Sequence, residues 1–231
     1  MLTFYFNLAP NPMKVALLLE ELGIAYETVP VDTRRGEQFA DAFVRINPNA
    51  KLPAIVDDGV RVFDSNAILL YLGDKHGRFC PAASDLKGRG EMLSWLMFIA
   101  SGIGPYSGQA VHFRHNVPKP EPYALNRYDF EAERHWNIIE QRLGEHRYML
   151  GAEYSIVDMC LWGWARLVPY VMGDEAVWTR FPQIKRVLDE INDRPAAARV
   201  QELRGKYKFK AEMDDEARAF MYRHLARSGK P

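Results

Sequence analysis

The feature that most constrains this chain is the stretch from Asn47 to Leu72, NPNAKLPAIVDDGVRVFDSNAILLYL. Two short apolar runs, Ala54 to Val56 and Val60 to Phe63, flank the turn signal Asp57-Asp58-Gly59. Runs of this length suit buried strands and are too short for helices. An Asp-Gly step between two apolar runs is typical of a tight hairpin. We therefore predict an antiparallel pair of strands here.

A helix is expected directly after this hairpin. Ser65 is a good N-cap, because its hydroxyl can accept a hydrogen bond from one of the N–H groups that a helix leaves unpaired in its first turn. Ile68 and Leu72 fall on one apolar face, and Gly77 is placed to end the helix. The helix start has the Asp64 carboxylate beside it, and a helix start of this kind favours an anion.

The segments before the hairpin alternate between strand and helix patterns. Strands are expected at residues 2–6 and 26–31, and helices from Pro12 to the closing Gly23 and at residues 39–46. Asn11 is the expected N-cap of the first helix, and Lys14 lies among the polar residues opposite its apolar stripe. Because crossovers are right-handed, the first two strands are parallel neighbours in a mixed four-stranded sheet. This is the thioredoxin-like order of elements.

Composition and charge limit the possible partners and the compartment. The chain of 231 residues is 48% hydrophobic, and its thirty basic and thirty acidic residues cancel, which argues against nucleic acid or an anionic membrane as a partner. Cys80 and Cys160 form neither a CxxC pair nor a zinc spacing, so we expect no metal site. No signal-peptide pattern and no apolar run near the roughly 20 residues that span a bilayer is present, so we expect a cytoplasmic protein.

Strand patterns nearly vanish after residue 77. Helices are expected at residues 85–103, 126–143, 155–168, 182–192, 195–203 and 214–226, and a proline-rich loop at residues 105–123. Ser155 and Asp158 form a capping box at one helix start, a structural motif without chemistry. The sequence thus predicts an α/β N-terminal domain over residues 1–77, a linker over residues 78–84 and an all-α C-terminal domain over residues 85–231.

The Leu52-Pro53 step, the hairpin and the Asp64-Ser65 pair resemble the glutathione site of glutathione S-transferases. The two-domain plan extends this resemblance over nearly the whole chain. In that family the proline is cis, the residue before it pairs through its backbone with the cysteinyl unit of glutathione, and the acidic-serine pair holds the γ-glutamyl carboxylate and ammonium. The resemblance therefore implies that Leu52, Pro53, Asp64 and Ser65 bind glutathione. For Asp64 and Ser65 the alternative is a plain helix cap.

Glutathione chemistry requires a thiolate, and an unperturbed thiol with a pKa of about 8.5 is only some 3% ionised at pH 7. The first strand and its turn resemble the bacterial Nu-class and yeast-prion-like branch of the family, in which a Thr-Pro-Asn turn faces the sulfur. This chain keeps Asn11 and has Ala9 in place of the threonine. The resemblance implies that Asn11 stabilises the thiolate, with backbone N–H groups beside it. The alternative for Asn11 is an N-cap alone.

Three further residues are candidates for contacts with glutathione, and two of them, Gln38 and Arg134, resemble contacts of that branch. Gln38 lies on the loop before the second helix, and its alternative is simple solvent exposure. Lys51 would pair with the glycyl carboxylate or be a solvated charge. Arg134 lies in a helix pattern whose arginine reaches the glutathione cleft in Nu-like proteins, and its alternative is a surface ion pair.

The resemblance implies a glutathione S-transferase or a glutathione-dependent disulfide or peroxide reductase. Glutathione would be the co-substrate, a small electrophile, disulfide or peroxide the second substrate, and a homodimer the assembly. The Nu-like features favour thiol-disulfide or peroxide chemistry. The alternative, favoured by Ala9, is a non-catalytic glutathione-binding or regulatory protein on the same fold.

Overall fold

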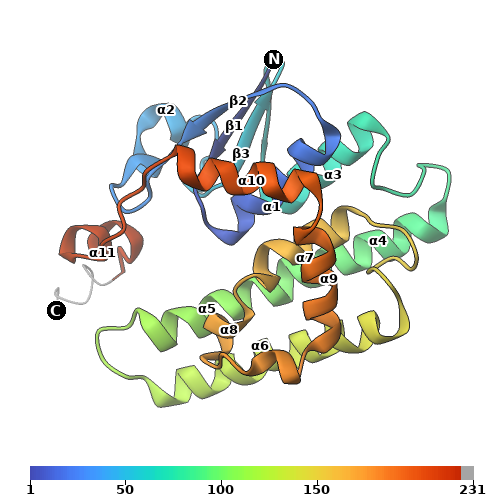
Figure 1. Cartoon of the computed structure of the whole chain (residues 1–231). Coiled ribbons are helices and arrows are strands. Elements are labelled where there is room, and N and C mark those ends of the chain that lie inside the picture. Colours follow the sequence, from blue (N-terminus) through green and yellow to red (C-terminus); the bar gives the residue numbers. More distant parts are fainter. Residues whose placement is uncertain (225–231) are drawn as a thin grey trace. The chain divides into compact units, whose positions relative to one another are not determined.

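The computed structural model describes residues 1–224, and its N-terminal part contains a four-stranded sheet in the order β2–β1–β3–β4 (Figure 1). The strands are β1 (Leu2–Phe6), β2 (Tyr26–Pro30), β3 (Ala54–Asp57) and β4 (Val60–Phe63). β1 pairs in parallel with β2 and antiparallel with β3, which pairs antiparallel with β4. Asp58 and Gly59 both have positive φ, as a two-residue hairpin turn of type I′ requires. The predicted mixed sheet and its hairpin are confirmed.

The pairing register brings several turns of the chain to one edge of this sheet. Tyr5 lies opposite Ala54, and Ala54 lies opposite Phe63, so β1 and β4 end where β3 begins. Because β2 is parallel to β1, the loop after Pro30 leaves from the same place. We call this the carboxyl edge: the edge at which β1, β2 and β4 end and β3 begins. Helices α1 (Pro10–Leu22) and α3 (Ser65–His76) both start directly after it.

The start of α1 differs from the prediction. The helix begins at Pro10 rather than Pro12, and its N-cap is Ala9, which makes no side-chain cap. Proline suits this first helical position because its missing N–H would be unpaired there in any case. Lys14 was expected on the polar side, but it is only 2% exposed, since α1 is covered on nearly every side.

The helix expected at residues 39–46 is shorter than predicted. A single 3₁₀ turn, η1 (Glu37–Phe39), precedes α2 (Asp41–Val44). Phe43 on α2 is buried beside Tyr5 of β1, with ring centroids 5.8 Å apart. One buried aromatic side chain is the anchor of this short helix, and the extended Ala40 separates it from η1.

The chain divides into two compact units, one of residues 1–71 with 199–224 and one of residues 72–198. Residues 85–231 were predicted to form one domain, whereas residues 199–224 pack with the first unit. Arg199 on α10 (Pro195–Lys206) pairs with Glu20 of α1, Nε to Oε2 2.6 Å. The ring of Tyr207 meets that of Phe6 edge to face, with centroids 5.2 Å apart. An ion pair and an aromatic contact thus hold this part of the chain to the first unit.

The second unit is helical. Its elements are α4 (Leu86–Phe98), the π-helical turn η2 (Ile99–Ile103), α5 (Gly104–His115), α6 (Pro122–Glu145), α7 (Ile156–Ala165), α8 (Val168–Met172), the 3₁₀ turn η3 (Val177–Thr179) and α9 (Pro182–Asn192). The loop expected at residues 105–123 is wrong, because most of it forms α5. The helix changes register at η2 just before Pro105, so the missing N–H falls at the start of the next segment.

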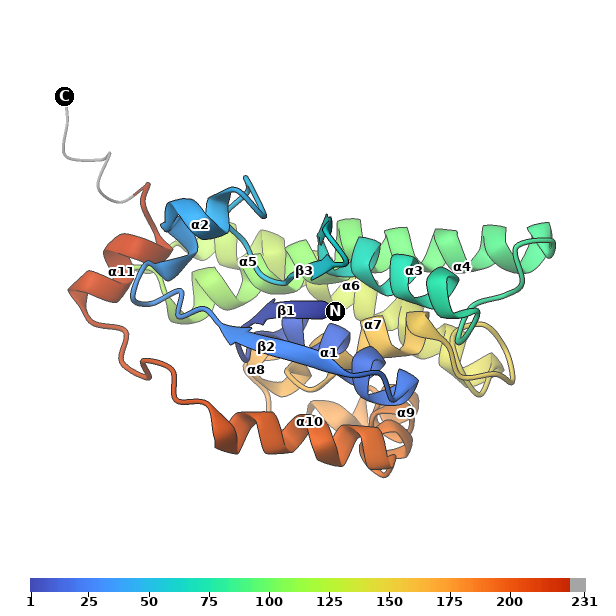
Figure 2. The same cartoon turned by 90° about the horizontal axis from the view of Figure 1, so that it is seen from above.

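Two predicted elements near the C-terminus have a mixed outcome. The helix expected at residues 195–203 is α10 and extends to Lys206. The segment expected at residues 214–226 contains α11 (Asp215–Met221), capped by Asp214, whose Oδ1 accepts from the N–H of Ala217. Residues 225 and 226 of that prediction lie outside the described residues. Figures 1 and 2 both draw α11, in red, on the side of the first unit where α2 lies.

The predicted capping box at the start of α7 is confirmed. The Ser155 hydroxyl accepts from the N–H of Val157, and Asp158 Oδ2 accepts from the N–H of Ser155 at 2.9 Å. Asp158 Oδ1 accepts from the N–H of Met149 at 2.8 Å. Burial raises the pKa of Asp158 to about 6, although these donors act in the opposite direction. The box is fully buried and every carboxylate oxygen in it is used, so its role is structural.

Candidate glutathione site

The Leu52–Pro53 peptide bond is cis, as the resemblance implied. Leu52 lies just before β3, and among the described residues neither its N–H nor its C=O makes a backbone hydrogen bond. Asn47 shapes the approach: its Nδ2 donates to the Lys51 carbonyl at 2.7 Å, and its side chain is buried. An open N–H and C=O on one residue at a sheet edge can pair with an extended peptide, as a strand would.

Asp64, rather than Ser65, caps helix α3. Asp64 Oδ1 accepts from the N–H groups of Asn66 at 2.8 Å and Ala67 at 3.2 Å. The prediction of Ser65 as N-cap is wrong, because the carboxylate one residue earlier reaches both donors and leaves Ser65 as the first helical residue. The cap uses one carboxylate oxygen only. Within residues 1–224, Oδ2 of Asp64 and the hydroxyl of Ser65 make no hydrogen bond, so both remain open to a ligand.

The start of α1 offers few donors. Pro10 and Pro12 have no N–H, and the N–H of Met13 donates to the Ala9 carbonyl at 3.3 Å. The N–H of Ala9 is used as well, since it donates to Asn7 Oδ1 at 3.0 Å. Of the first three helical positions, Pro10, Asn11 and Pro12, only Asn11 has a backbone N–H. Asn11 also has a side-chain amide. Two donors for an anion at this helix start would therefore both come from Asn11, one from its backbone and one from its side chain.

Lys14 and Asn66 connect the starts of α1 and α3, a contact that the sequence analysis missed. Lys14 Nζ donates to Asn66 Oδ1 at 2.8 Å, and the two residues are 2% and 5% exposed. Lysine is rarely so buried. The available signal was a lysine within the apolar run from Met13 to Leu19. The contact ties the residue after Ser65 to the helix that carries Asn11.

Gln38 lies on the loop from Asp32 to Phe39, which follows β2 at the carboxyl edge. Gln38 is 4% exposed, so the alternative of simple solvent exposure does not hold. Its Nε2 donates to the Thr33 carbonyl at 3.3 Å. Its Oε1 is buried and has no hydrogen-bond partner in the described part of the chain. A buried acceptor without a donor is costly, and a bound ligand with an N–H or O–H would satisfy it.

Lys51 and Arg134 have different surroundings. Lys51 is exposed, and its side chain makes no ion pair with any residue in the range 1–224. Arg134, on α6 in the second unit, is 46% exposed and pairs with Glu131, Nη2 to Oε2 2.9 Å. Glu131 also pairs with Arg127, and these two arginines lower its pKa. Two cations thus share one carboxylate on this face of α6, which leaves the group with a net positive charge.

Family models describing the N-terminal and C-terminal domains of glutathione S-transferases match residues 1–74 and 123–190. Disulfide-bond oxidoreductase YfcG of Escherichia coli (strain K12) is 36% identical over 94% of this chain and 98% of its own length. The chain belongs to the glutathione S-transferase family. The prediction of family from the Leu52-Pro53 and Asp64-Ser65 residues is confirmed.

Solved structures similar to this glutathione S-transferase include two with glutathione ligands. Glutathione transferase URE2P6 of Phanerochaete chrysosporium, in complex with oxidized glutathione, has a TM-score of 0.83 and 32% identity, covering 89% of this chain and 96% of that chain. A family member from Pseudomonas fluorescens pf-5, with two glutathione bound, has a TM-score of 0.81 and 34% identity, covering 87% and 92%. These neighbours confirm the fold class and the yeast-prion-like branch.

Within residues 1–224 of this glutathione S-transferase, no group of three or more His, Cys, Asp or Glu side chains is arranged to hold a metal ion. None of the helices described there is both long and apolar enough to cross a membrane.

Proposed function

We propose that this protein is a glutathione-dependent thiol-disulfide or peroxide reductase with transferase capability. The observation that carries the proposal is the set of open polar groups at the carboxyl edge: the N–H and C=O of Leu52, the second carboxylate oxygen of Asp64 and the Ser65 hydroxyl. Glutathione is an extended tripeptide with an ammonium and a carboxylate at its γ-glutamyl end. The γ-glutamyl ammonium, the γ-glutamyl carboxylate and the cysteinyl backbone each have a complement in this set.

The proposed mode of binding follows from charge and register. The Asp64 carboxylate takes the γ-glutamyl ammonium, and the hydroxyl and N–H of Ser65 take the carboxylate at the start of α3. The cysteinyl backbone pairs with the N–H and C=O of Leu52, the residue before the cis bond to Pro53. Gln38 accepts from the ligand, and Lys51 pairs with the glycyl carboxylate. This places the cysteinyl sulfur toward the start of α1, where Asn11 donates to it.

The thiolate requires stabilisation. Lowering the thiol pKa by about two units takes roughly 2.7 kcal/mol of preferential stabilisation of the thiolate. A charge-assisted hydrogen bond contributes about 1.5–3 kcal/mol, so the side-chain amide and N–H of Asn11 together are sufficient. Ala9 contributes no donor from its side chain.

Disulfide exchange fits the chemistry of this chain. The bound thiolate attacks one sulfur of a disulfide, forming a mixed disulfide and releasing the other half as a thiol. A second glutathione then attacks the mixed disulfide, giving oxidised glutathione and the second thiol. Two glutathione molecules supply both electrons, so no protein cysteine is needed. Cys80 is unsuited to the reaction, because burial and then the nearby Asp74 raise its pKa to about 11.

The relatives support the same chemistry. YfcG is named a disulfide-bond oxidoreductase, as is YghU of Escherichia coli (strain K12), which is 37% identical over 82% of this chain and 70% of its own length. The Pseudomonas fluorescens neighbour holds two glutathione molecules. The role of Arg134 in glutathione binding, which the resemblance implies, stays a prediction.

Binding and turnover are tested separately. Calorimetric titration with glutathione and with its disulfide is expected to give saturable binding at millimolar concentrations or below. Turnover is measured with 2-hydroxyethyl disulfide, and with 1-chloro-2,4-dinitrobenzene for conjugation. Absence of binding to both forms of glutathione would overturn the proposal.

The missing side-chain donor at Ala9 favours a second function, a non-catalytic glutathione-binding protein. Tight binding without turnover on a panel of disulfides, peroxides and electrophiles would establish it. We also propose a homodimer, which sedimentation at micromolar protein concentration tests directly.

A further inference from the structure

The segment from Tyr207 to His224, here called the C-terminal segment, lies outside both residue ranges that the family models match. It begins with two aromatic anchors on the first unit. The rings of Tyr207 and Phe209 both meet Phe6 edge to face, with centroid distances of 5.2 and 6.0 Å. Phe6 is fully buried in β1. The Tyr207 hydroxyl also bonds to that of Thr28 on β2.

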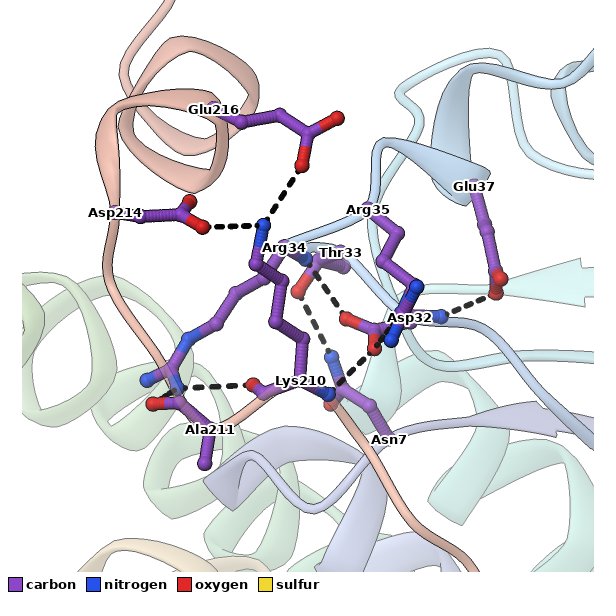
Figure 3. Close-up of polar contacts among 10 residues, drawn as sticks. All are labelled: Asn7, Asp32, Thr33, Arg34, Arg35, Glu37, Lys210, Ala211, Asp214 and Glu216. Atoms are coloured by element: carbon purple, nitrogen blue, oxygen red, sulfur yellow. Dashed lines mark hydrogen bonds and ion pairs between the residues drawn. The ribbon is translucent and has the colours of Figure 1, made fainter.

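Side chains of the Asp32–Phe39 loop then bind the backbone of the C-terminal segment, as Figure 3 shows. Asp32 is 7% exposed, and its Oδ2 accepts from the N–H of Lys210 at 2.6 Å. The guanidinium of Arg34 donates to the carbonyls of Lys210, at 3.0 Å, and Ala211. These loop side chains satisfy backbone groups that a neighbouring strand would otherwise pair.

The same buried carboxylate organises the loop itself. Asp32 Oδ1 accepts from the N–H of Arg34 at 3.0 Å, and the N–H of Asp32 donates to Glu37 Oε2 at 2.6 Å. The Asp32 carboxylate therefore holds both the loop residue Arg34 and the C-terminal segment, whereas the contact that closes the loop is made by the Asp32 N–H and the Glu37 carboxylate. One residue, Asp32, takes part in both the loop conformation and the docking of the segment.

Beyond Lys210 the C-terminal segment turns back over the loop. Lys210 Nζ pairs with Asp214 and Glu216 at 2.8 Å each, which ties the extended part to α11 (Figure 3). The Phe220 ring of α11 covers Gly36, where an added Cβ would come within 2.5 Å of it. Gly36 also has φ +78°, so glycine is required there for two reasons.

Gln38 lies between two residues that are held in place. Glu37 accepts from the N–H of Asp32, and the Phe39 ring lies under the Arg223 guanidinium at 4.5 Å. The buried Oε1 of Gln38 is the atom that has no donor within the described residues. A side chain with a buried and unsatisfied acceptor keeps that conformation only if its surroundings impose it.

We propose that the C-terminal segment is a working part of the glutathione site: it holds the Asp32–Phe39 loop so that Gln38 presents its amide oxygen to the bound tripeptide. Phe220, Arg34 and Asp32 are then positioning residues, which act on glutathione through Gln38. This inference rests on the proposed function.

The test is a double-mutant cycle between Phe220 and Gln38, with the dissociation constant of glutathione measured by calorimetry. Phe220→Ala is expected to weaken binding about tenfold, the size expected for one lost hydrogen bond to a ligand. Gln38→Ala is expected to weaken binding by the same factor, and the double variant no further than Gln38→Ala alone. Met221→Ala, an exposed neighbour on the same helix, is the matched control and is expected to bind as wild type does.

Hydrogen exchange provides a readout that is independent of the ligand. The amides of Arg34 and Gly36 are expected to exchange faster in Phe220→Ala and unchanged in Met221→Ala. If Phe220→Ala fails to fold, Arg34→Gln replaces it, because that change removes only the donors to the Lys210 and Ala211 carbonyls.

Three results would overturn the inference while leaving the proposed function intact. These are wild-type affinity in Phe220→Ala, wild-type affinity in Gln38→Ala, and a double variant whose losses multiply. Failure of the wild-type protein to bind glutathione at all would instead overturn the proposed function itself, and the inference with it.

Discussion

The helices α7 and α3 both start with a serine and an aspartate, but these residues have different hydrogen-bond partners in the two helices. At the start of α7, Ser155 and Asp158 are buried, and both carboxylate oxygens of Asp158 accept from backbone N–H groups. At the start of α3, Asp64 caps with one oxygen only, and its other oxygen and the Ser65 hydroxyl make no bond among the described residues. The first start is closed and the second is open.

The difference shows how a cap can be distinguished from a binding site. A closed start contributes stability, because it satisfies donors that would otherwise be buried without partners. An open start has polar groups without a partner in the described chain, and a ligand can pair with them. The start of α1 is different again: Pro10 and Pro12 have no N–H, so Asn11 is the one residue among the first three helical positions with a backbone N–H.

The largest effect is expected at the start of α1. Asn11→Ala removes the donor that we propose acts on the thiolate, and loss of one such donor typically lowers the rate about 10²–10³-fold. We therefore expect kcat/KM for 2-hydroxyethyl disulfide to fall by roughly that factor, with a small change in the calorimetric affinity for glutathione. Equal activity of variant and wild type would remove Asn11 from the mechanism.

At the closed start, Asp158→Ala is expected to act on stability alone. It leaves the N–H groups of Met149 and Ser155 buried without an acceptor, which we expect to cost about 3 kcal/mol of the free energy of unfolding. Urea denaturation measures this loss. The fraction that remains folded is expected to bind glutathione as wild type does. A fall in affinity without a fall in stability would contradict the assignment of α7 as a closed start.

At the open start, Asp64→Asn is expected to act in the opposite way. Asparagine caps a helix about as well as aspartate, so the free energy of unfolding is expected to stay within about 0.5 kcal/mol. The affinity for glutathione is expected to fall roughly 10–100-fold, because the charge that pairs with the γ-glutamyl ammonium is lost. Asp64→Ala serves as the comparison, since it removes both the charge and the cap. If Asp64→Asn binds glutathione as tightly as wild type does, Asp64 is a helix cap only and does not bind the γ-glutamyl ammonium.

The smallest expected effect is a gain. Ala9→Thr adds a hydroxyl next to the start of α1, and a second donor to the sulfur is expected to raise kcat/KM up to about tenfold. Ala9→Val, which has the same shape without the hydroxyl, is the matched control. If both variants change the rate equally, the effect comes from packing and the position has no role as a donor.

The sheet was predictable because its signals are local. The Asp-Gly turn sets the register of β3 and β4, and the positive φ values of Asp58 and Gly59 are those that this turn requires. The capping box at Ser155 was predictable for the same reason, since its partners lie within one helical turn. The helix α5 was not, because Pro105 breaks a helix in most contexts and is tolerated here after a π-helical turn.

The candidate site residues could be named from the sequence, but their surroundings could not. Leu52, Asp64 and Ser65 form a spacing that the chain displays locally, and the sheet register brings them to one edge. Lys14 was assigned to a polar face, although it is buried against Asn66, 52 residues away. No signal in the sequence indicated the roles of Asp32 and Arg34, because their partners Lys210 and Ala211 lie 176–178 residues later in the chain.

The sequence by itself determined the family and the hairpin of the mixed sheet, because both depend on residues within about one turn or hairpin of one another. It also supplied the candidate glutathione-binding residues, through the family resemblance. Only the tertiary structure decided which acceptors at the helix starts are already used and which are open. It also decided that residues 199–224 pack on the first unit, and that Gln38 has a buried oxygen without a donor in the described chain. Those facts depend on contacts between segments far apart in sequence, which no local pattern records.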